Sequence, residues 1–138
     1  MRKIHISKQK ITIINIRKPV QKNINQELQW LGTSLGLFNL RDKDKSCFRI
    51  FIEMLKTAKN KRALSSDELA YHLGLSRGTV VHHINKLMEA GIVISEKNKY
   101  LLRVDNLQSL IDEVEKDIKR TTEQLKDVAK DIDTWLGL

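Results

Sequence analysis

Apolar residues recur at helical spacing in two adjacent stretches near the middle of the chain, and a short turn separates them. In the first stretch Leu69 and Leu73 fall on one face, and Gly74 follows where a left-handed residue commonly ends a helix. Ser65 or Ser66 is suited to cap the start of this helix. The pattern predicts a short helix that begins near residue 65 and ends before Gly74.

The second stretch predicts a longer helix over residues 76–90. Ser76 can cap it, and Val80, Ile84 and Leu87 recur at intervals of four and three, so the helix has one buried face. Its other face carries side chains that can hydrogen-bond to base edges or phosphates, namely Arg77, Thr79, His82, Asn85 and Lys86. Two helices joined by such a turn are the layout of a helix-turn-helix.

Two β-type runs follow Gly91, over residues 92–95 and 99–104, and they flank a polar turn at residues 96–98. The spacing predicts a short hairpin with lysines at its tip.

The segment LSRGTVVHHINKLMEAGIV, residues 75–93, resembles the recognition helix and first wing strand of winged helix-turn-helix regulators, in particular the ArsR-like group of small prokaryotic repressors. The resemblance extends over residues 44–104. It implies a DNA-binding dimer that places the helix of residues 76–90 in a major groove. It also implies that His83 is a partly buried structural histidine. Members that sense metals carry paired cysteines, and this chain has only Cys47, so we expect no metal and no cofactor.

A third helical pattern, from residue 44 to about 59, resembles the first helix of a winged-helix domain. Asp42 or Asp44 can cap it. Its predicted buried stripe consists of Cys47, Phe48, Phe51, Ile52, Leu55 and Ala58. A single thiol on an apolar face favours a buried hydrophobe over a redox sensor.

A fourth pattern predicts a helix over residues 23–38, with Asn25 as its cap and Ile24, Leu28, Leu31 and Leu35 as its stripe. Trp30 widens this stripe. We therefore expect the helix to pack on the C-terminal helix or on a partner subunit.

The N-terminal residues 1–22 are basic and rich in isoleucine, which predicts one or two β-type segments before Pro19. Residues 11–17 are the better strand. This segment is either a basic arm that touches the DNA backbone, or an edge strand or solvated tail.

The C-terminal residues 105–138 contain a heptad-like seam. Apolar residues alternate steps of three and four, with one polar exception, along Ile111, Val114, Ile118, Thr121, Leu125, Val128, Ile132 and Trp135. A helix over residues 107–136 would be about 45 Å long, too long for a small domain to cover. The seam predicts a homodimer. The alternative, an intramolecular hairpin with the helix near residues 25–35, would leave much of the seam uncovered.

Charge is distributed unevenly along the chain. The net charge is +8, and residues 1–26 hold seven basic and no acidic residues, whereas residues 105–138 hold five basic and nine acidic ones. A basic protein favours polyanionic partners such as nucleic acid. The absence of a long apolar run and of cysteine pairs predicts a soluble, cytoplasmic protein without a membrane segment.

No enzyme motif is present, since the chain lacks both a nucleophile with an adjacent base and a glycine-rich phosphate loop. His72, His82 and His83 could approach one another, but no carboxylates are obviously placed to complete a metal site. The chain has 5% aromatic residues, mostly at expected core positions, which disfavours stacking on single-stranded RNA.

These patterns together predict a mostly α fold with a small β-hairpin wing. It is a winged helix-turn-helix (residues 44–104) with an N-terminal arm (1–22), an accessory helix and connector (23–43) and a C-terminal dimerisation helix (105–138). The expected function is sequence-specific binding of double-stranded DNA as a homodimeric regulator, most simply a repressor, and the alternative is a winged-helix scaffold for protein partners. Candidate base-edge contacts are Arg77, Thr79, Val81, His82 and Asn85. Candidate phosphate contacts are Arg62, Ser76, Lys86, Lys97 and Lys99.

Overall fold

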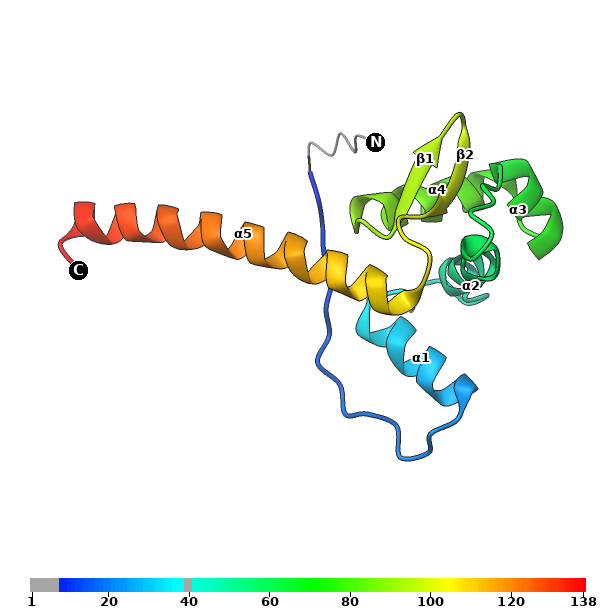
Figure 1. Ribbon diagram of the computed structural model, residues 1–138, viewed down its shortest axis with the longest axis horizontal. Helices are drawn as coiled ribbons and strands as arrows, with labels where there is room; N and C mark the ends of the chain where they lie inside the picture. Colours follow the sequence, from blue (N-terminus) through cyan, green and yellow to red (C-terminus); the bar gives the residue numbers. More distant parts are fainter. Residues whose placement is uncertain (1–7, 39–40) are drawn as a thin grey trace.

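The computed structural model describes residues 8–38 and 41–138 of the chain, so the first part of the predicted N-terminal arm, residues 1–7, lies outside it. Within these ranges the elements are α1 (Ile24–Ser34), α2 (Ser46–Ala58), α3 (Ser66–Leu73), α4 (Arg77–Glu89), β1 (Val93–Glu96), β2 (Lys99–Leu102) and α5 (Leu107–Leu136). Figure 1 shows α2, α3, α4 and the hairpin gathered into one body, from which α5 projects. The predicted fold class, a winged helix-turn-helix with a long C-terminal helix, is confirmed.

The core of this winged body forms where α2 packs against α4. Ile50, Phe51 and Met54 of α2 have no exposed surface, and the same holds for Val80 and Ile84 of α4. Each such side chain contributes about 1.5–3 kcal/mol by leaving water. The predicted stripe of α2 is correct in direction, but Phe48, Ile52 and Leu55 are only partly covered while Ile50 and Met54 fill the centre.

Local capping fixes the boundaries of the two helix-turn-helix elements. Ser65 accepts a hydrogen bond from the Glu68 amide, and the Glu68 side chain accepts one from the Ser65 amide, so the two residues form a capping box at α3. Gly74 ends α3 with φ of 64°, which a residue without a Cβ adopts at little cost. Ser76 caps α4 by accepting from the Thr79 amide.

The wing is a two-stranded antiparallel hairpin, in which Glu96 pairs with Lys99 at the tip and Val93 with Leu102 at the root. Lys97 and Asn98 make the turn with φ of 51° and 62°, the sign that a two-residue turn of the favoured hand requires.

The N-terminal region differs from its prediction. No strand forms between residues 8 and 22, and the predicted strand over residues 11–17 is instead an extended segment with isolated backbone bonds, among them Lys10 N–H to Glu89 O at 3.0 Å. It therefore does not extend a sheet. In Figure 1 this segment passes α5 on its way to α1.

The accessory helix α1 is shorter than the predicted range 23–38, and its cap lies two residues before the predicted one. Asn23, not Asn25, caps it by accepting from the Gln26 amide, and it ends at Ser34. Trp30 donates its indole N–H to Ile16 O at 3.2 Å, so it contacts the N-terminal segment, whereas we expected this helix to pack on the C-terminal helix or on a partner subunit. A Cβ on Gly32 would lie 2.7 Å from the Phe48 ring, which shows how closely α1 approaches α2.

The boundaries of α5 match the predicted 107–136, and Asn106 caps its first turn. Leu110, Val114 and Asp117 are buried against the winged body, whereas every residue from Lys119 onward is exposed. About half of the helix thus has no neighbour in its own chain (Figure 1).

Candidate nucleic-acid interface

The outward face of α4 is open to solvent. Arg77, His82, Asn85 and Lys86 are exposed, and Thr79 and Val81 are half-buried. The buried residues Val80, Ile84 and Leu87 hold the opposite face in the core, so helical geometry directs the polar set outward. The structure thus places all five candidate base-edge residues on one helix, each at least partly exposed.

Three candidates at the start of α4 have polar groups that are already engaged within the chain. The Ser76 hydroxyl accepts from the Thr79 amide at 3.1 Å and donates to Thr79 Oγ1 at 2.8 Å. Arg77 Nε lies 3.6 Å from the carboxylate of Asp67 on α3. The Arg77 pair is exposed, and an exposed ion pair contributes little and is readily exchanged for another anion.

The remaining phosphate candidates lie in two places. Lys97 and Lys99 are exposed at and beside the wing tip. Arg62 belongs to the loop after α2 and pairs with Glu68 at 3.1 Å. The hydrogen bond from the Ser65 amide lowers the pKa of Glu68, so this carboxylate stays charged and remains a partner for Arg62.

The loop that precedes α2 borders α4, a feature that we did not expect from the sequence. A cleft runs between them, lined by Arg41 and Lys43 of the loop and by Thr79, His82 and Lys86 of α4. Arg41 and Lys43 therefore add positive charge beside the candidate interface. The sequence alone gave little indication that Arg41 and Lys43 belong to this surface, because only folding brings residues 41–46 next to α4.

A contact between two largely buried side chains, Asp42 of the loop and His83 of α4, connects this loop to α4. Asp42 accepts from the amides of Ser46 and Cys47, each at 3.0 Å, and so pairs the first amides of α2, although the N-cap position itself is Lys45 and not Asp42 or Asp44. Its carboxylate also lies 3.7 Å from His83 Nε2. Burial lowers the pKa of His83, and the nearby Asp42 carboxylate partly offsets this effect. His83 is 7% exposed, which confirms its predicted structural role.

The other chemistry that the sequence left open receives no support. His72 lies 3.8 Å from Glu53. No cluster of three potential metal ligands occurs in the described parts of the chain. Burial raises the pKa of the Cys47 thiol to about 11, which leaves it protonated and unreactive.

The predicted dimer seam divides into a covered and an uncovered part. Val114 is 4% exposed and belongs to the core of its own chain, so it is not available to a partner as predicted. Ile118 is half-buried beside the N-terminal segment, Ile111 is 38% exposed, and Thr121 is exposed. The uncovered apolar residues of the distal half are Leu125, Val128, Ile132 and Trp135, which are 65%, 57%, 43% and 80% exposed. We call these four the distal stripe.

Residues 54–95, from the second half of α2 to β1, match the family model of the bacterial regulatory proteins of the arsR family. This segment is similar to the helix-turn-helix part of the ArsR-like winged regulators. The ArsR-like match supports a DNA-binding transcription regulator, a class of protein that is generally not enzymatic. It does not include α1 or α5. No curated protein and no solved structure matches the chain significantly. In the ranges 8–38 and 41–138, no helix is both long and apolar enough to cross a membrane.

Proposed function

We propose that this ArsR-like protein is a homodimeric repressor that binds a two-fold symmetric site on duplex DNA. One observation carries the proposal: a single chain presents an exposed, polar α4 face and, on the projecting half of α5, an exposed apolar stripe. The first surface suits a DNA groove, and the second suits another protein surface. A second copy of the chain would supply a protein surface that covers the stripe, and it would also supply a second α4 to contact DNA.

The α4 face is suited to read one half-site. Arg77 can donate two hydrogen bonds to a guanine, and Asn85 can pair with an adenine, the most discriminating contacts available in the major groove. His82 and the methyl groups of Val81 lie between them in sequence. Lys86, Lys97 and Lys99 are exposed and carry the charge that neutralises phosphates. The loop residue Lys43 adds a further cation beside α4.

The distal stripe is suited to a helical partner. Its members follow one another at intervals of three, four and three, which places them along one side of α5. Ala129 and Leu136, each one position after a stripe residue, widen this side with small and apolar groups. In a dimer the two α4 helices would contact half-sites separated by about 34 Å, one turn of DNA, or by a multiple of it.

The test combines a dimerisation measurement with a DNA-binding measurement on one double variant. Leu125→Asp with Val128→Asp places two charges in the distal stripe without touching the winged body, so we expect a monomer. Light scattering measures the mass, and selection from a random pool of duplexes followed by titration measures the binding. We expect the wild type to select palindromic sites and the monomer to lose at least about tenfold in affinity for them, because it can hold only one half-site at a time.

The control is Lys116→Ala with Lys130→Ala, which lowers the net charge by the same two units at positions away from the stripe. This variant should remain dimeric and lose much less affinity than the double aspartate variant. The proposal fails if the aspartate variant is monomeric yet binds palindromic duplexes as tightly as the wild type. Salt-insensitive binding, or no selected sequence at all, would instead favour a scaffold for protein partners.

A further inference from the structure

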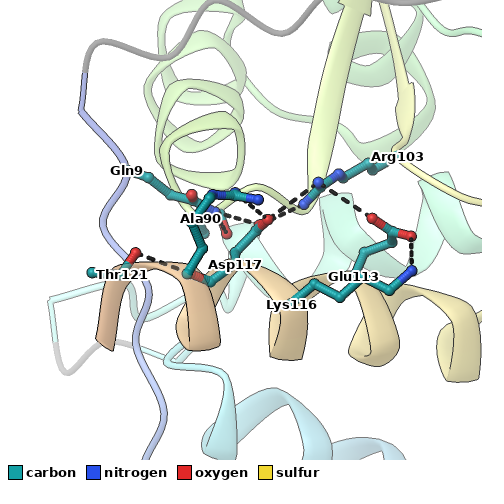
Figure 2. A network of polar contacts seen from close by, with 8 residues as sticks. Gln9, Ala90, Arg103, Glu113, Lys116, Asp117 and Thr121 are labelled. Atoms are coloured by element: carbon teal, nitrogen blue, oxygen red, sulfur yellow. Dashed lines mark hydrogen bonds and ion pairs between the residues drawn. The ribbon is translucent and has the colours of Figure 1, made fainter. Parts of the chain in front are cut away.

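Asp117 is a buried carboxylate at the point where α5 leaves the winged body. The residue is 2% exposed, whereas the other acidic residues of α5 are exposed or, in the case of Glu113, half-buried. Three side chains donate to its oxygens: Arg103 at 2.5 and 3.3 Å, Gln9 at 2.8 Å and Arg120 at 2.8 Å. Figure 2 shows Arg103 and Gln9 reaching this carboxylate from opposite sides.

The donors come from different parts of the chain, so Asp117 joins segments that are far apart in sequence. Arg103 follows β2 directly, and its amide bonds to Ile92 O at 3.0 Å at the root of the wing. Gln9 belongs to the N-terminal segment and also donates to Ala90 O, at the end of α4, at 3.4 Å. We call Asp117, Arg103 and Gln9 the hub.

The packing around the hub leaves little freedom. A Cβ on Gly91 would lie 2.5 Å from Gln9 Nε2 and 3.3 Å from Asp117 Oδ2. Gly91 connects α4 to the wing with φ of 79°, so the absence of a side chain there serves both the turn and the contact. Burial acts to raise the pKa of Asp117, but the hydrogen bonds from Arg103 and Gln9 outweigh it and lower the pKa, so the carboxylate stays ionised.

A buried charge of this kind resists displacement. If α5 rotated against the wing, the carboxylate would lose Arg103 and Gln9 and keep only Arg120, which lies on α5 and moves with it. An incompletely paired charge that is still excluded from water is strongly disfavoured. The part of α5 beyond Asp117 is long, since Trp135 lies about 27 Å along the helix from Asp117. A rotation of about 10° at Asp117 would move that end by about 5 Å, more than the 3.4 Å rise of one base pair.

We propose that Asp117 is a positioning residue for DNA reading: through Arg103 and Gln9 it fixes the direction of α5 relative to α4 and the wing, and thereby the half-site spacing that the dimer accepts. This inference rests on the proposed function. Asp117 itself touches no DNA, because it is buried and acts only through the geometry of the two subunits.

The first test measures the geometry within one chain and needs neither DNA nor a dimer. Spin labels at Lys97→Cys on the wing and Glu123→Cys on distal α5, in a Cys47→Ala background, report one distance, and dilution with unlabelled protein removes distances between subunits. We expect a narrow distribution with Asp117 present and a broad or shifted one with Asp117→Asn, which keeps the shape but removes the charge. Gln9→Ala is a milder change and should broaden the distance distribution less. It replaces Asp117→Asn in this test if that variant folds poorly.

The second test measures spacing preference. The affinity of each dimer is compared between its best palindrome and the same palindrome with one base pair inserted or removed between the half-sites. We expect the wild type to lose about tenfold or more on the altered sites, and Asp117→Asn to lose only about threefold or less. General destabilisation would lower the affinity for all sites equally and leave this ratio unchanged. The control Lys116→Ala, which removes only the exposed pair with Glu113 at 3.4 Å, should keep both wild-type results.

The outcomes separate this inference from the proposed function. A narrow, unshifted distance in both hub variants overturns the inference whatever the DNA results, and so does a broad distance combined with a wild-type spacing ratio. A broad distance with a relaxed ratio supports it. If the wild type binds no palindromic duplex, the proposed function fails, and the distance measurement still decides whether Asp117 fixes the direction of α5.

Discussion

At the scale of single residues, the polar groups that matter most to the architecture are those that folding removes from water. Asp42 and Asp117 each keep their charge because several donors surround them, and both have lowered pKa values despite burial. His83 is the opposite case. It is buried with its Nδ1 unpaired, and its charged form is disfavoured. These three residues make the protein sensitive to acid in different ranges of pH.

The burial of His83 leads us to expect a lower free energy of unfolding under mildly acidic conditions. Its pKa in the folded state is lowered, chiefly by burial, so the unfolded state, with a histidine pKa of about 6.5, takes up the proton first as the pH falls. The contribution is therefore fully present above about pH 6.5 and is lost as the pH falls toward the folded value. We expect the free energy of unfolding, measured in urea, to decrease between pH 7.5 and 5.5, and His83→Gln to reduce that decrease.

His72→Gln is the control, because His72 is exposed and lies 3.8 Å from Glu53 on α2. It should reduce the decrease in stability less than His83→Gln does. Equal pH dependence in the wild type and in His83→Gln would show that His83 does not titrate differently in the folded and unfolded states.

At the scale of elements, helix boundaries follow from caps, and the caps decide between neighbouring residues that look equivalent in the sequence. Ser65 and Ser66 were both suited to cap α3, and the structure assigns the role to Ser65, with Ser66 as the first helical residue. Similarly, Asn23 and not Asn25 caps α1. A shift of one or two residues changes which amides lack a partner, and only the folded backbone determines it.

The α3 cap gives a prediction with an internal control. Ser65→Ala removes the acceptor for the Glu68 amide and should lower the free energy of unfolding by about 1 kcal/mol, a typical value for a lost serine cap. Ser66→Ala, next in the chain, removes no capping bond and should cost less. Urea unfolding at pH 7.5 measures both variants. A larger cost for Ser66→Ala than for Ser65→Ala would contradict the capping assignment.

At the scale of the whole molecule, the basic and the acidic surfaces lie on different parts of the structure. The winged body carries exposed cations on α4 and the wing, whereas α5 is rich in acidic residues and carries the distal stripe. This arrangement keeps most carboxylates of α5 away from the exposed cations, so they neither pair with those cations nor repel the phosphates that the body would bind. It is consistent with the division of labour that we propose, in which the body reads DNA and α5 joins the subunits.

Counterion release makes that division measurable. We expect the logarithm of the affinity for a palindromic duplex to fall linearly with the logarithm of salt concentration, because bound phosphates release their cations. Lys86→Ala should reduce the slope by about 1 per subunit in contact and weaken binding to all sequences alike. Lys130→Ala, an equal charge change on distal α5, should leave the slope nearly unchanged. Equal slopes for Lys86→Ala and the wild type would remove Lys86 from the phosphate contacts.

The sequence by itself determined the features that arise from local periodicity. The helix-turn-helix, its caps at Ser76 and Gly74, the hairpin and the length of α5 all depend on residues a few positions apart, and the structure agrees with each of them. The outward direction of the α4 polar face followed in the same way, because a buried stripe fixes the opposite side of a helix.

Only the tertiary structure decided which surfaces cover which. The isoleucines of residues 11–17 are separated mostly by polar residues, as in a strand, yet no sheet edge is paired with them, and they run as an extended segment instead. Val114 has the spacing of a dimer seam but is buried in its own chain, and Asp117, one of nine acidic residues in 105–138, is buried where Gln9 and Arg103 pack against it. The physical reason is the same in each case: periodicity tells which side of an element is apolar, but the neighbour that covers that side comes from a distant part of the chain.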